Sequence, residues 1–317
     1  MNGAFRRIRE ICSTLDACAQ SLDALRADHP VSGAAISDAG GDAPLWGGTV
    51  GARPSRVNGT SFWYDEIEPL YRELDELIRY APGELCESVL CDEQIRTLAP
   101  GIHRIRAAYE RDRELIQARK LVKADDAQAR LKSTIDQESY WALGEELLRA
   151  LNASRHILVA GSGPLPLTAL CIGATLDVHV TCVERDAESH SLGQQLIGMS
   201  GLEERFESIN ADILDLTNFD DYDAIVGVVL LGVGTEDHQT STKAAIAQHI
   251  ITHMSPGTRM VLRDPHGLGN LLYPSVELGE NTEVDVTRHV PDVGLNRPYR
   301  SGLVVAERRS PDTDHAH

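Results

Sequence analysis

The sequence contains no run of about 18 apolar residues, the length that a membrane-spanning helix requires, so we predict no transmembrane segment. Basic residues are also scarce: 30 Lys and Arg stand against 48 Asp and Glu, and the formal net charge is -18. Because this excess of negative charge repels phosphates, nucleic acid and anionic membranes are not expected as partners. Residues 1–20 lack the apolar core of a secretory signal, and none is expected.

Disulfide and metal motifs are missing as well. The six cysteines form no CxxC pair, and Cys171 and Cys182 fall on segments predicted to be a core helix and a strand. These features favour reduced thiols and a cytoplasmic protein. His249 and His253 have HxxxH spacing, but the glutamate of an HExxH motif is absent. We therefore interpret the pair as ordinary helix residues and predict no metal site.

The most informative stretch that is present is RHILVAGSGPLPLTA, residues 155–169. Its apolar run at 157–160 is typical of a central parallel strand that is covered on both faces. Gly161-Ser162-Gly163 then permits a sharp turn and the close approach of a ligand, since glycine has no Cβ. Pro164 is suited to the first position of a following helix. Such a turn presents backbone N–H groups to a carboxylate, a phosphate or a ribose.

The predicted elements fall into two architectures. Residues 1–28 predict an amphipathic helix, and residues 29–60, rich in Gly, Ala, Ser and Pro, predict a flexible linker. Residues 61–150 have helical patterning and predict a helical lid or acceptor domain, whereas residues 151–308 alternate strands with helices. The tail 309–317 is predicted to be disordered. The predicted fold class is therefore α/β, a Rossmann-like doubly wound parallel sheet with an antiparallel final hairpin, preceded by an all-helical domain.

Polar residues follow the predicted strands at the ends where ligands bind in such sheets. Glu184 ends the second strand, about twenty residues after the glycine turn, and is expected to accept hydrogen bonds from two ribose hydroxyls. Asp212 follows the third strand and is expected to receive an adenine amino group, and Gly232 follows the fourth strand. Each acid alone is more often a solvated loop carboxylate. Their joint order favours a nucleoside site.

The glycine turn also indicates which nucleoside ligand is expected. A dinucleotide site prefers G-x-G-x-x-G, but this turn is GSGPLP, without the third glycine. The spacing from Asn210 to Asp212 instead resembles S-adenosylmethionine-binding sheets of the methyltransferase type. Compared with ordinary methyltransferases of that type, the usual acid two residues before the first glycine is replaced by Val159.

Several segments resemble the nicotianamine synthase family. GSGPLPLT at 161–168 is similar to a hallmark of that family, and LRDPHG at 262–267 and LLYP at 271–274 resemble two further segments. YWAL at 140–143 falls on a helix that the family has just before the sheet. The resemblance extends over residues 90–307.

The resemblance implies an enzyme that uses S-adenosylmethionine as a co-substrate. In this family an amine attacks the γ-carbon of the methionine part, the 3-amino-3-carboxypropyl group is transferred, and 5'-methylthioadenosine leaves. The implied acceptor is a small amine or amino acid, and the implied pathway makes nicotianamine-type or opine-type metallophores. Intramolecular cyclisation to azetidine-2-carboxylate is one alternative. A small-molecule methyltransferase and a non-catalytic nucleoside-binding protein are the others.

A transfer of this kind requires an amine that is held in place, kept neutral and shielded from water. A carboxylate and a phenol can meet these needs, so Glu110 and Tyr140 are the catalytic candidates. Glu114 lies on the same acidic helix as Glu110. Arg263 and His266 are candidates for binding a carboxylate of the co-substrate or acceptor. The competing interpretations are a half-buried helix tyrosine for Tyr140 and a solvated helix face for Glu110.

Overall fold

The computed structural model describes residues 2–28, 61–135, 146–151, 153–228, 243–276, 278, 284–289 and 301–309. The predicted linker 29–60 and the predicted tail beyond residue 309 lie outside these ranges. Two predicted site residues, Tyr140 and Gly232, lie outside them as well.

The chain divides into two compact units, and the division falls inside one long helix. The first unit includes Met1–Tyr109 and Gly267–Leu272, and the second includes Glu110–His266, Tyr273–Asp292 and Ser301–His317. The domain boundaries expected from the sequence at residues 28, 60, 150 and 308 stay a prediction.

The first unit is helical, as its patterning predicts. It contains α1 (Asn2–Asp28), α2 (Ser61–Arg79), α3 (Gly83–Cys91) and the first half of α4 (Glu93–Val122). Apolar residues at helical spacing are fully buried, such as Ile8, Ile11 and Leu15 on α1. The helix α3 was not expected from the sequence. It begins directly after Pro82, which occupies its N-cap position.

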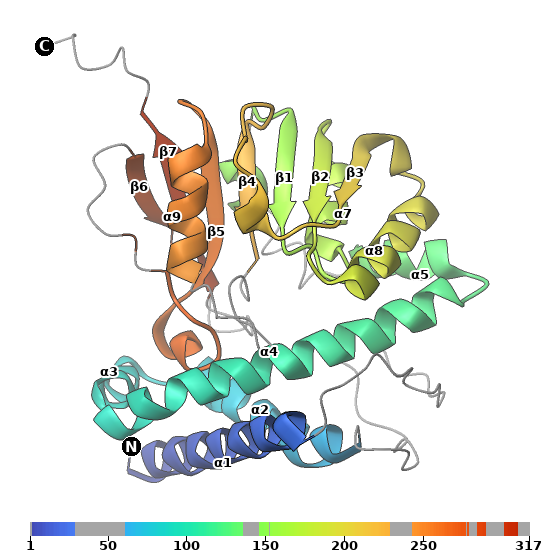
Figure 1. Cartoon of the computed structure of the whole chain (residues 1–317). Coiled ribbons are helices and arrows are strands. Elements are labelled where there is room, and N and C mark those ends of the chain that lie inside the picture. Colours follow the sequence, from blue (N-terminus) through green and yellow to red (C-terminus); the bar gives the residue numbers. More distant parts are fainter. Residues whose placement is uncertain are drawn as a thin grey trace, which may run out of the picture. The chain divides into compact units, whose positions relative to one another are not determined.

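The second unit contains a seven-stranded sheet among the residues described (Figure 1). Its strands are β1 (His156–Ala160), β2 (His179–Val183), β3 (Phe206–Ile209), β4 (Ala224–Gly227), β5 (Arg259–Pro265), β6 (Val284–His289) and β7 (Ser301–Arg308). The order is β3-β2-β1-β4-β5-β7-β6. Strands β1 to β5 pair in parallel, whereas β7 pairs antiparallel with both β5 and β6. This topology confirms the predicted Rossmann-like doubly wound sheet and its antiparallel final pair.

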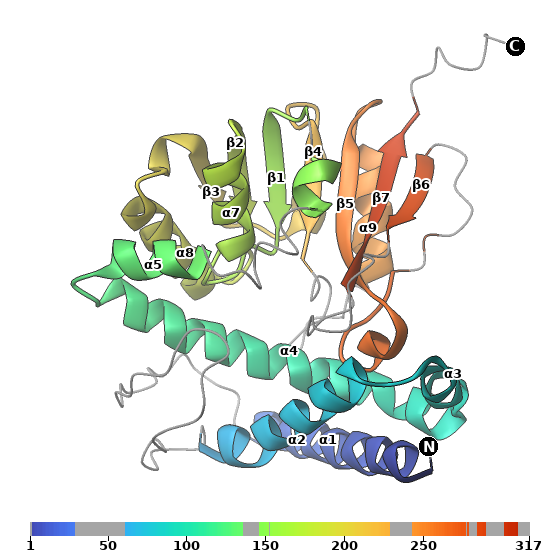
Figure 2. The same ribbon diagram turned by 180° about the vertical axis from the view of Figure 1, so that it is seen from behind.

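Helices cover both faces of this sheet. They are α5 (Ala127–Ile135), α7 (Leu167–Thr175), α8 (Ala187–Ser200) and α9 (Lys243–His253). In Figure 1 α9 lies in front of the sheet, and in Figure 2, seen from behind, α7 does. Burial on both faces explains the apolar run of β1, whose residues Ile157 to Ala160 are all 0% exposed. The carboxyl ends of the strands are thereby left as the edge where polar residues gather.

The glycine turn after β1 does not lead directly into a helix. The prediction that Pro164 begins a helix is wrong, because α7 begins at Leu167 with Pro166 as its N-cap residue. Gly161 and Gly163 both adopt positive φ, 70° and 72°, and the chain needs three more residues to enter helical geometry.

On α9, the Nε2 of His249 lies 2.8 Å from the carbonyl oxygen of Leu216, which makes it a structural contact.

In the described ranges, no helix combines the length and the apolar character that crossing a membrane requires. The same ranges contain no group of three or more His, Cys, Asp or Glu side chains placed to hold a metal ion.

Candidate functional site

The glycine turn after β1 is joined to the end of β2 by backbone hydrogen bonds. The N–H groups of Gly161 and Ser162 donate to the carbonyl oxygen of Val183, at 2.9 and 3.2 Å. The next N–H, that of Gly163, donates to Oε2 of Glu184 at 3.0 Å. The other carboxylate oxygen of Glu184 accepts from the N–H of Asp186 at 2.9 Å. The structure thus brings Glu184 directly against the predicted glycine turn.

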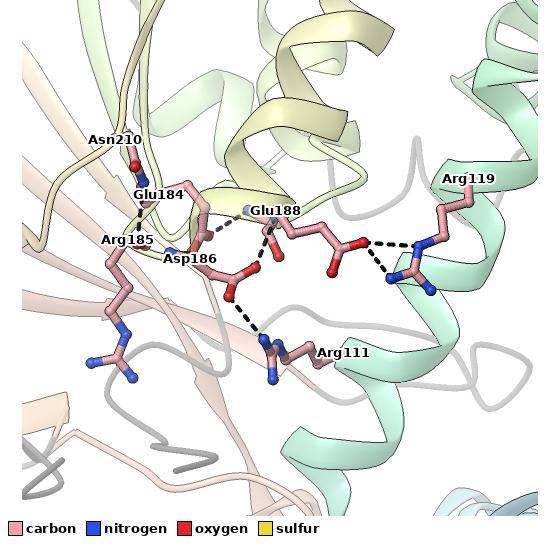
Figure 3. A network of polar contacts seen from close by, with 9 residues as sticks. Arg111, Arg119, Glu184, Arg185, Asp186, Glu188 and Asn210 are labelled. Carbon is pink, nitrogen blue, oxygen red and sulfur yellow. Dashed lines mark hydrogen bonds and ion pairs between the residues drawn. The ribbon is translucent and has the colours of Figure 1, made fainter. Parts of the chain in front are cut away.

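A second acid-containing loop follows β3 and supports the first. The amide of Asn210 donates to the carbonyl oxygens of Glu184 at 2.8 Å and Arg185 at 3.1 Å, as Figure 3 shows. Asp212 accepts from the N–H of Leu214 at 3.0 Å, and its other oxygen lies 3.4 Å from the guanidinium of Arg185. Asp212 therefore caps a short helical turn while it remains partly exposed at the sheet edge.

Two carboxyl groups of α4, Glu110 and Glu114, form what we call the carboxyl pair. Oε1 of Glu110 accepts a hydrogen bond of 2.7 Å from the hydroxyl of Tyr273. Oε2 of Glu114 lies 3.1 Å from the point that a Cβ on Gly163 would occupy. A Cβ at position 163 would displace Glu114 by a few tenths of an ångström, and the positive φ of this residue disfavours any side chain there.

The environment of Glu114 favours its protonated form. The pKa of Glu114 is raised from 4.5 to about 8, first by burial and then by the carboxylates of Glu110 and Glu184, whereas Arg113 and Arg263 oppose the shift. A carboxyl group with this pKa is mostly protonated at neutral pH. It can therefore donate a hydrogen bond, and it gives up its proton readily when positive charge arrives.

Arginine residues of α4 bind the start of α8 (Figure 3). Arg111 donates to Asp186 at 2.9 Å, and Arg119 forms an ion pair with Glu188. Asp186 is also the N-cap residue of α8, since its Oδ1 accepts from the N–H of Ser189 at 2.8 Å. Both ion pairs are partly exposed to solvent.

The predicted carboxylate-binding residues follow the fifth strand. Arg263 lies on β5 with a half-buried side chain, and its Nε is buried without a hydrogen-bond partner among the described residues. Its guanidinium is close enough to Glu114 to act on the pKa of that carboxyl group. His266 follows the strand and is exposed. Arg263 thus lies near Glu114, and its buried donor would gain from an anionic partner.

A buried charged cluster supports the segment that carries Tyr273. Asp264 accepts from the N–H of Val276 at 2.7 Å and from Arg288 at 2.9 Å, and it lies 3.6 Å from the Nζ of Lys243. That Nζ also donates to the carbonyl oxygens of Arg263 and of Pro274. Burial lowers the pKa of Lys243 to about 8, against the attraction of Asp264. The cluster ties the chain that directly follows Tyr273 to β5.

Three residues of this site were not among the site residues expected from the sequence: Tyr273, Glu114 and Arg111. Tyr273 lies in the LLYP segment, and its phenol donates a hydrogen bond to Glu110, whereas the phenol expected from the sequence was that of Tyr140. The spacing of Glu110 and Glu114 is a usable signal, because residues four apart share one face of a helix. No pattern in the sequence pairs Arg111 with Asp186, since their contact depends on where α4 lies against α8.

Comparison with known proteins gives one family. A family model described as "Nicotianamine synthase protein" matches residues 61–294. The nicotianamine synthase of Solanum lycopersicum is 32% identical over 131 residues, which are 40% of this chain and 39% of that relative. The chain spans about two fifths of the length of the curated relatives it matches.

Solved structures with a similar fold include two crystal structures of MtNAS. A mutant of MtNAS in complex with S-adenosylmethionine has a TM-score of 0.64 at 17% identity, over 78% of this chain and 92% of that chain. MtNAS in complex with MTA and tNA has a TM-score of 0.63 at 19% identity, over 78% of this chain and 89% of that chain. At these identities the likeness shows the fold alone, and it agrees with the sheet described above.

Proposed function

The chain belongs to the nicotianamine synthase family, and from this premise we propose that it transfers the 3-amino-3-carboxypropyl group of S-adenosylmethionine to an amine. A neutral amine attacks the γ-carbon of the methionine part. The bond from that carbon to sulfur breaks, and 5'-methylthioadenosine leaves with the electron pair of that bond. The new ammonium group then loses one proton. The proposed acceptor is a small amine or amino acid, and the product is a nicotianamine-type or opine-type metallophore precursor.

The proposed nucleoside site lies at the carboxyl ends of β1 to β4. Gly161, Ser162 and Gly163 allow the nucleoside to approach the backbone, and Glu184 accepts hydrogen bonds from the ribose hydroxyls. A carboxylate offers about four lone-pair positions, so Glu184 can keep its two backbone donors and still bind ribose. Asp212 is proposed to accept from the adenine amino group. Gly232 stays a prediction, because it lies outside the described residues.

The observation that carries the proposal is a set of three interacting carboxyl groups. Glu184 binds the glycine turn, Glu114 lies close to Gly163, and Glu110 acts on the pKa of Glu114. S-adenosylmethionine has a sulfonium and an ammonium group, and an amine acceptor adds a third cationic centre. We propose that Arg263, whose charge acts on Glu114, holds a carboxylate of the co-substrate or acceptor. This arrangement complements the charges of these reactants and differs from the GxGxxG turn that binds a dinucleotide.

The carboxyl pair supplies the proton chemistry in this proposal. With a pKa of about 8, Glu114 can lose its proton when the cationic co-substrate binds, and the resulting carboxylate can then accept a proton from the amine. Tyr273 orients Glu110 through its hydrogen bond of 2.7 Å. Tyr140 and His266 stay as predicted participants, the first as a second phenol near the amine and the second as a carboxylate ligand.

The test is to incubate the purified protein with S-adenosylmethionine, first alone and then with single amino acids such as histidine and glutamate, and to identify products by mass spectrometry. Methylthioadenosine that appears only with an acceptor supports the proposal. Methylthioadenosine with azetidine-2-carboxylate from S-adenosylmethionine alone would show the cyclisation alternative. Adenosylhomocysteine, or no turnover with any acceptor, would overturn the proposed transfer.

A further inference from the structure

We propose that Arg111 is a positioning residue. It acts through Asp186 to hold Glu184, the proposed ribose ligand, at a fixed position relative to the carboxyl pair of α4. This inference rests on the proposed function, since it assigns a role within the same site. It concerns a contact between two helices that neither binds the nucleoside nor touches the reacting atoms.

The contact runs through the backbone and the side chain of a single residue. The N–H of Asp186 donates to Oε1 of Glu184 at 2.9 Å, so the backbone at 186 helps to orient that carboxylate. The side chain of Asp186 accepts from Arg111 at 2.9 Å. Its other oxygen caps α8 through Ser189. Figure 3 shows Asp186 between Glu184 on one side and Arg111 on the other.

The position of Arg111 on α4 allows this contact to fix the carboxyl pair relative to Glu184. Arg111 follows Glu110 directly and precedes Glu114 by three residues. At a helical rise of about 1.5 Å per residue, Glu114 lies about 4.5 Å further along the axis. Because a helix is rigid over one turn, anchoring Arg111 to Asp186 sets where both members of the carboxyl pair lie relative to Glu184. The groups proposed to bind the ribose and the groups proposed to act at the reacting amine are thereby held at a fixed distance from one another.

The same pair of helices offers a matched control. Arg119 binds Glu188 two turns further along α4, with a comparable ion pair between the same two helices. The side chain of Glu188 is 50% exposed, whereas that of Asp186 is 32% exposed. The Arg119 pair joins α4 to α8, but it includes neither Asp186 nor the carboxylate of Glu184. Loss of either ion pair should change folding stability little, because partly exposed pairs contribute little.

The experiment compares Arg111→Met with Arg119→Met in the full chain, by kcat and KM for S-adenosylmethionine in methylthioadenosine release and by thermal unfolding. We expect Arg111→Met to lower kcat about 10- to 100-fold, as misplacement of reacting groups by about 1 Å does, while Arg119→Met changes it less than about twofold. Arg111→Lys should restore part of the activity, since it keeps the charge but not the planar fork. Equal effects of the two Met variants, or a loss that follows a lowered Tm, would overturn the proposal.

Asp186→Asn separates the ion pair from the helix cap. Its amide oxygen can still accept from Ser189, whereas the charge that binds Arg111 is gone. We expect this variant to resemble Arg111→Met, and the double variant to be no worse than either single one, because both remove the same contact. Additive losses in the double variant would contradict the coupling.

Failure of the proposed function can be told apart from failure of this inference. If the unchanged protein releases no methylthioadenosine, the proposed transfer fails, and the positioning role is then tested by binding alone. Titration calorimetry with S-adenosylmethionine should in that case still give a Kd at least about tenfold weaker for Arg111→Met than for Arg119→Met. Equal dissociation constants would overturn the positioning role.

Discussion

Replacing Glu114 by glutamine should raise the stability of the folded protein, and the gain should increase with pH. In the folded chain the pKa of Glu114 is raised from 4.5 to about 8, chiefly by burial. Between these two pH values the folded state holds a proton that the unfolded state has released. Since stability rises with pH only where the unfolded state binds more protons, this group lowers stability as pH rises through that window. Glutamine has no charge to bury and removes the effect.

The magnitude follows from the two pKa values. One pKa unit corresponds to about 1.4 kcal/mol, and the shift is about 3.5 units. At pH 5 the unfolded group is already partly ionised, so the destabilisation is about 1 kcal/mol, and at pH 9 it approaches about 5 kcal/mol. The variant should therefore gain about 4 kcal/mol in free energy of unfolding, relative to the unchanged protein, between pH 5 and pH 9.

The assay is denaturant unfolding followed by circular dichroism at unit pH steps from 5 to 9, with the two proteins side by side. Glu204→Gln is the control, because it makes the same substitution at an exposed side chain of the second unit. A constant difference between Glu114→Gln and the unchanged protein across this range would refute the reasoning. A gain that grows toward low pH would refute its sign.

Three further outcomes are expected. Tyr273→Phe should lower methylthioadenosine release about tenfold or more with little change in KM for S-adenosylmethionine, because Glu110 loses the phenol that orients it; kinetics at saturating acceptor test this. The pKa of Lys243 is lowered to about 8, so between pH 8 and pH 10.5 the unfolded state binds more protons than the folded state. The free energy of unfolding should therefore rise by about 3 kcal/mol over this range, and Lys243→Met should lack this rise in unfolding experiments. Binding of S-adenosylmethionine at pH 7 should release nearly one proton, since the cation favours ionised Glu114. Calorimetry in buffers of different ionisation enthalpy measures the number of protons released, and binding to Glu114→Gln should release none.

Much of the fold follows from local patterns in the chain. The apolar run at 157–160 predicts β1, because a parallel strand buried on both faces admits only apolar side chains. The alternation of such runs with helical stretches predicts the doubly wound sheet that the strand order shows. The short helices α3 and α5 were missed, since nine residues give little periodicity to detect.

The sheet, the family resemblance and the acids and glycines at the strand ends can all be predicted from the amino-acid order, because each depends on neighbours within a few residues. Which distant groups meet depends on how the elements pack together. This packing brings Glu114 to the glycine turn, gives Glu110 a phenol from Tyr273, and joins Arg111 to Asp186. The pKa of Glu114 belongs to this second class, because burial and the charges around a carboxyl group exist only once the helix packs against the sheet.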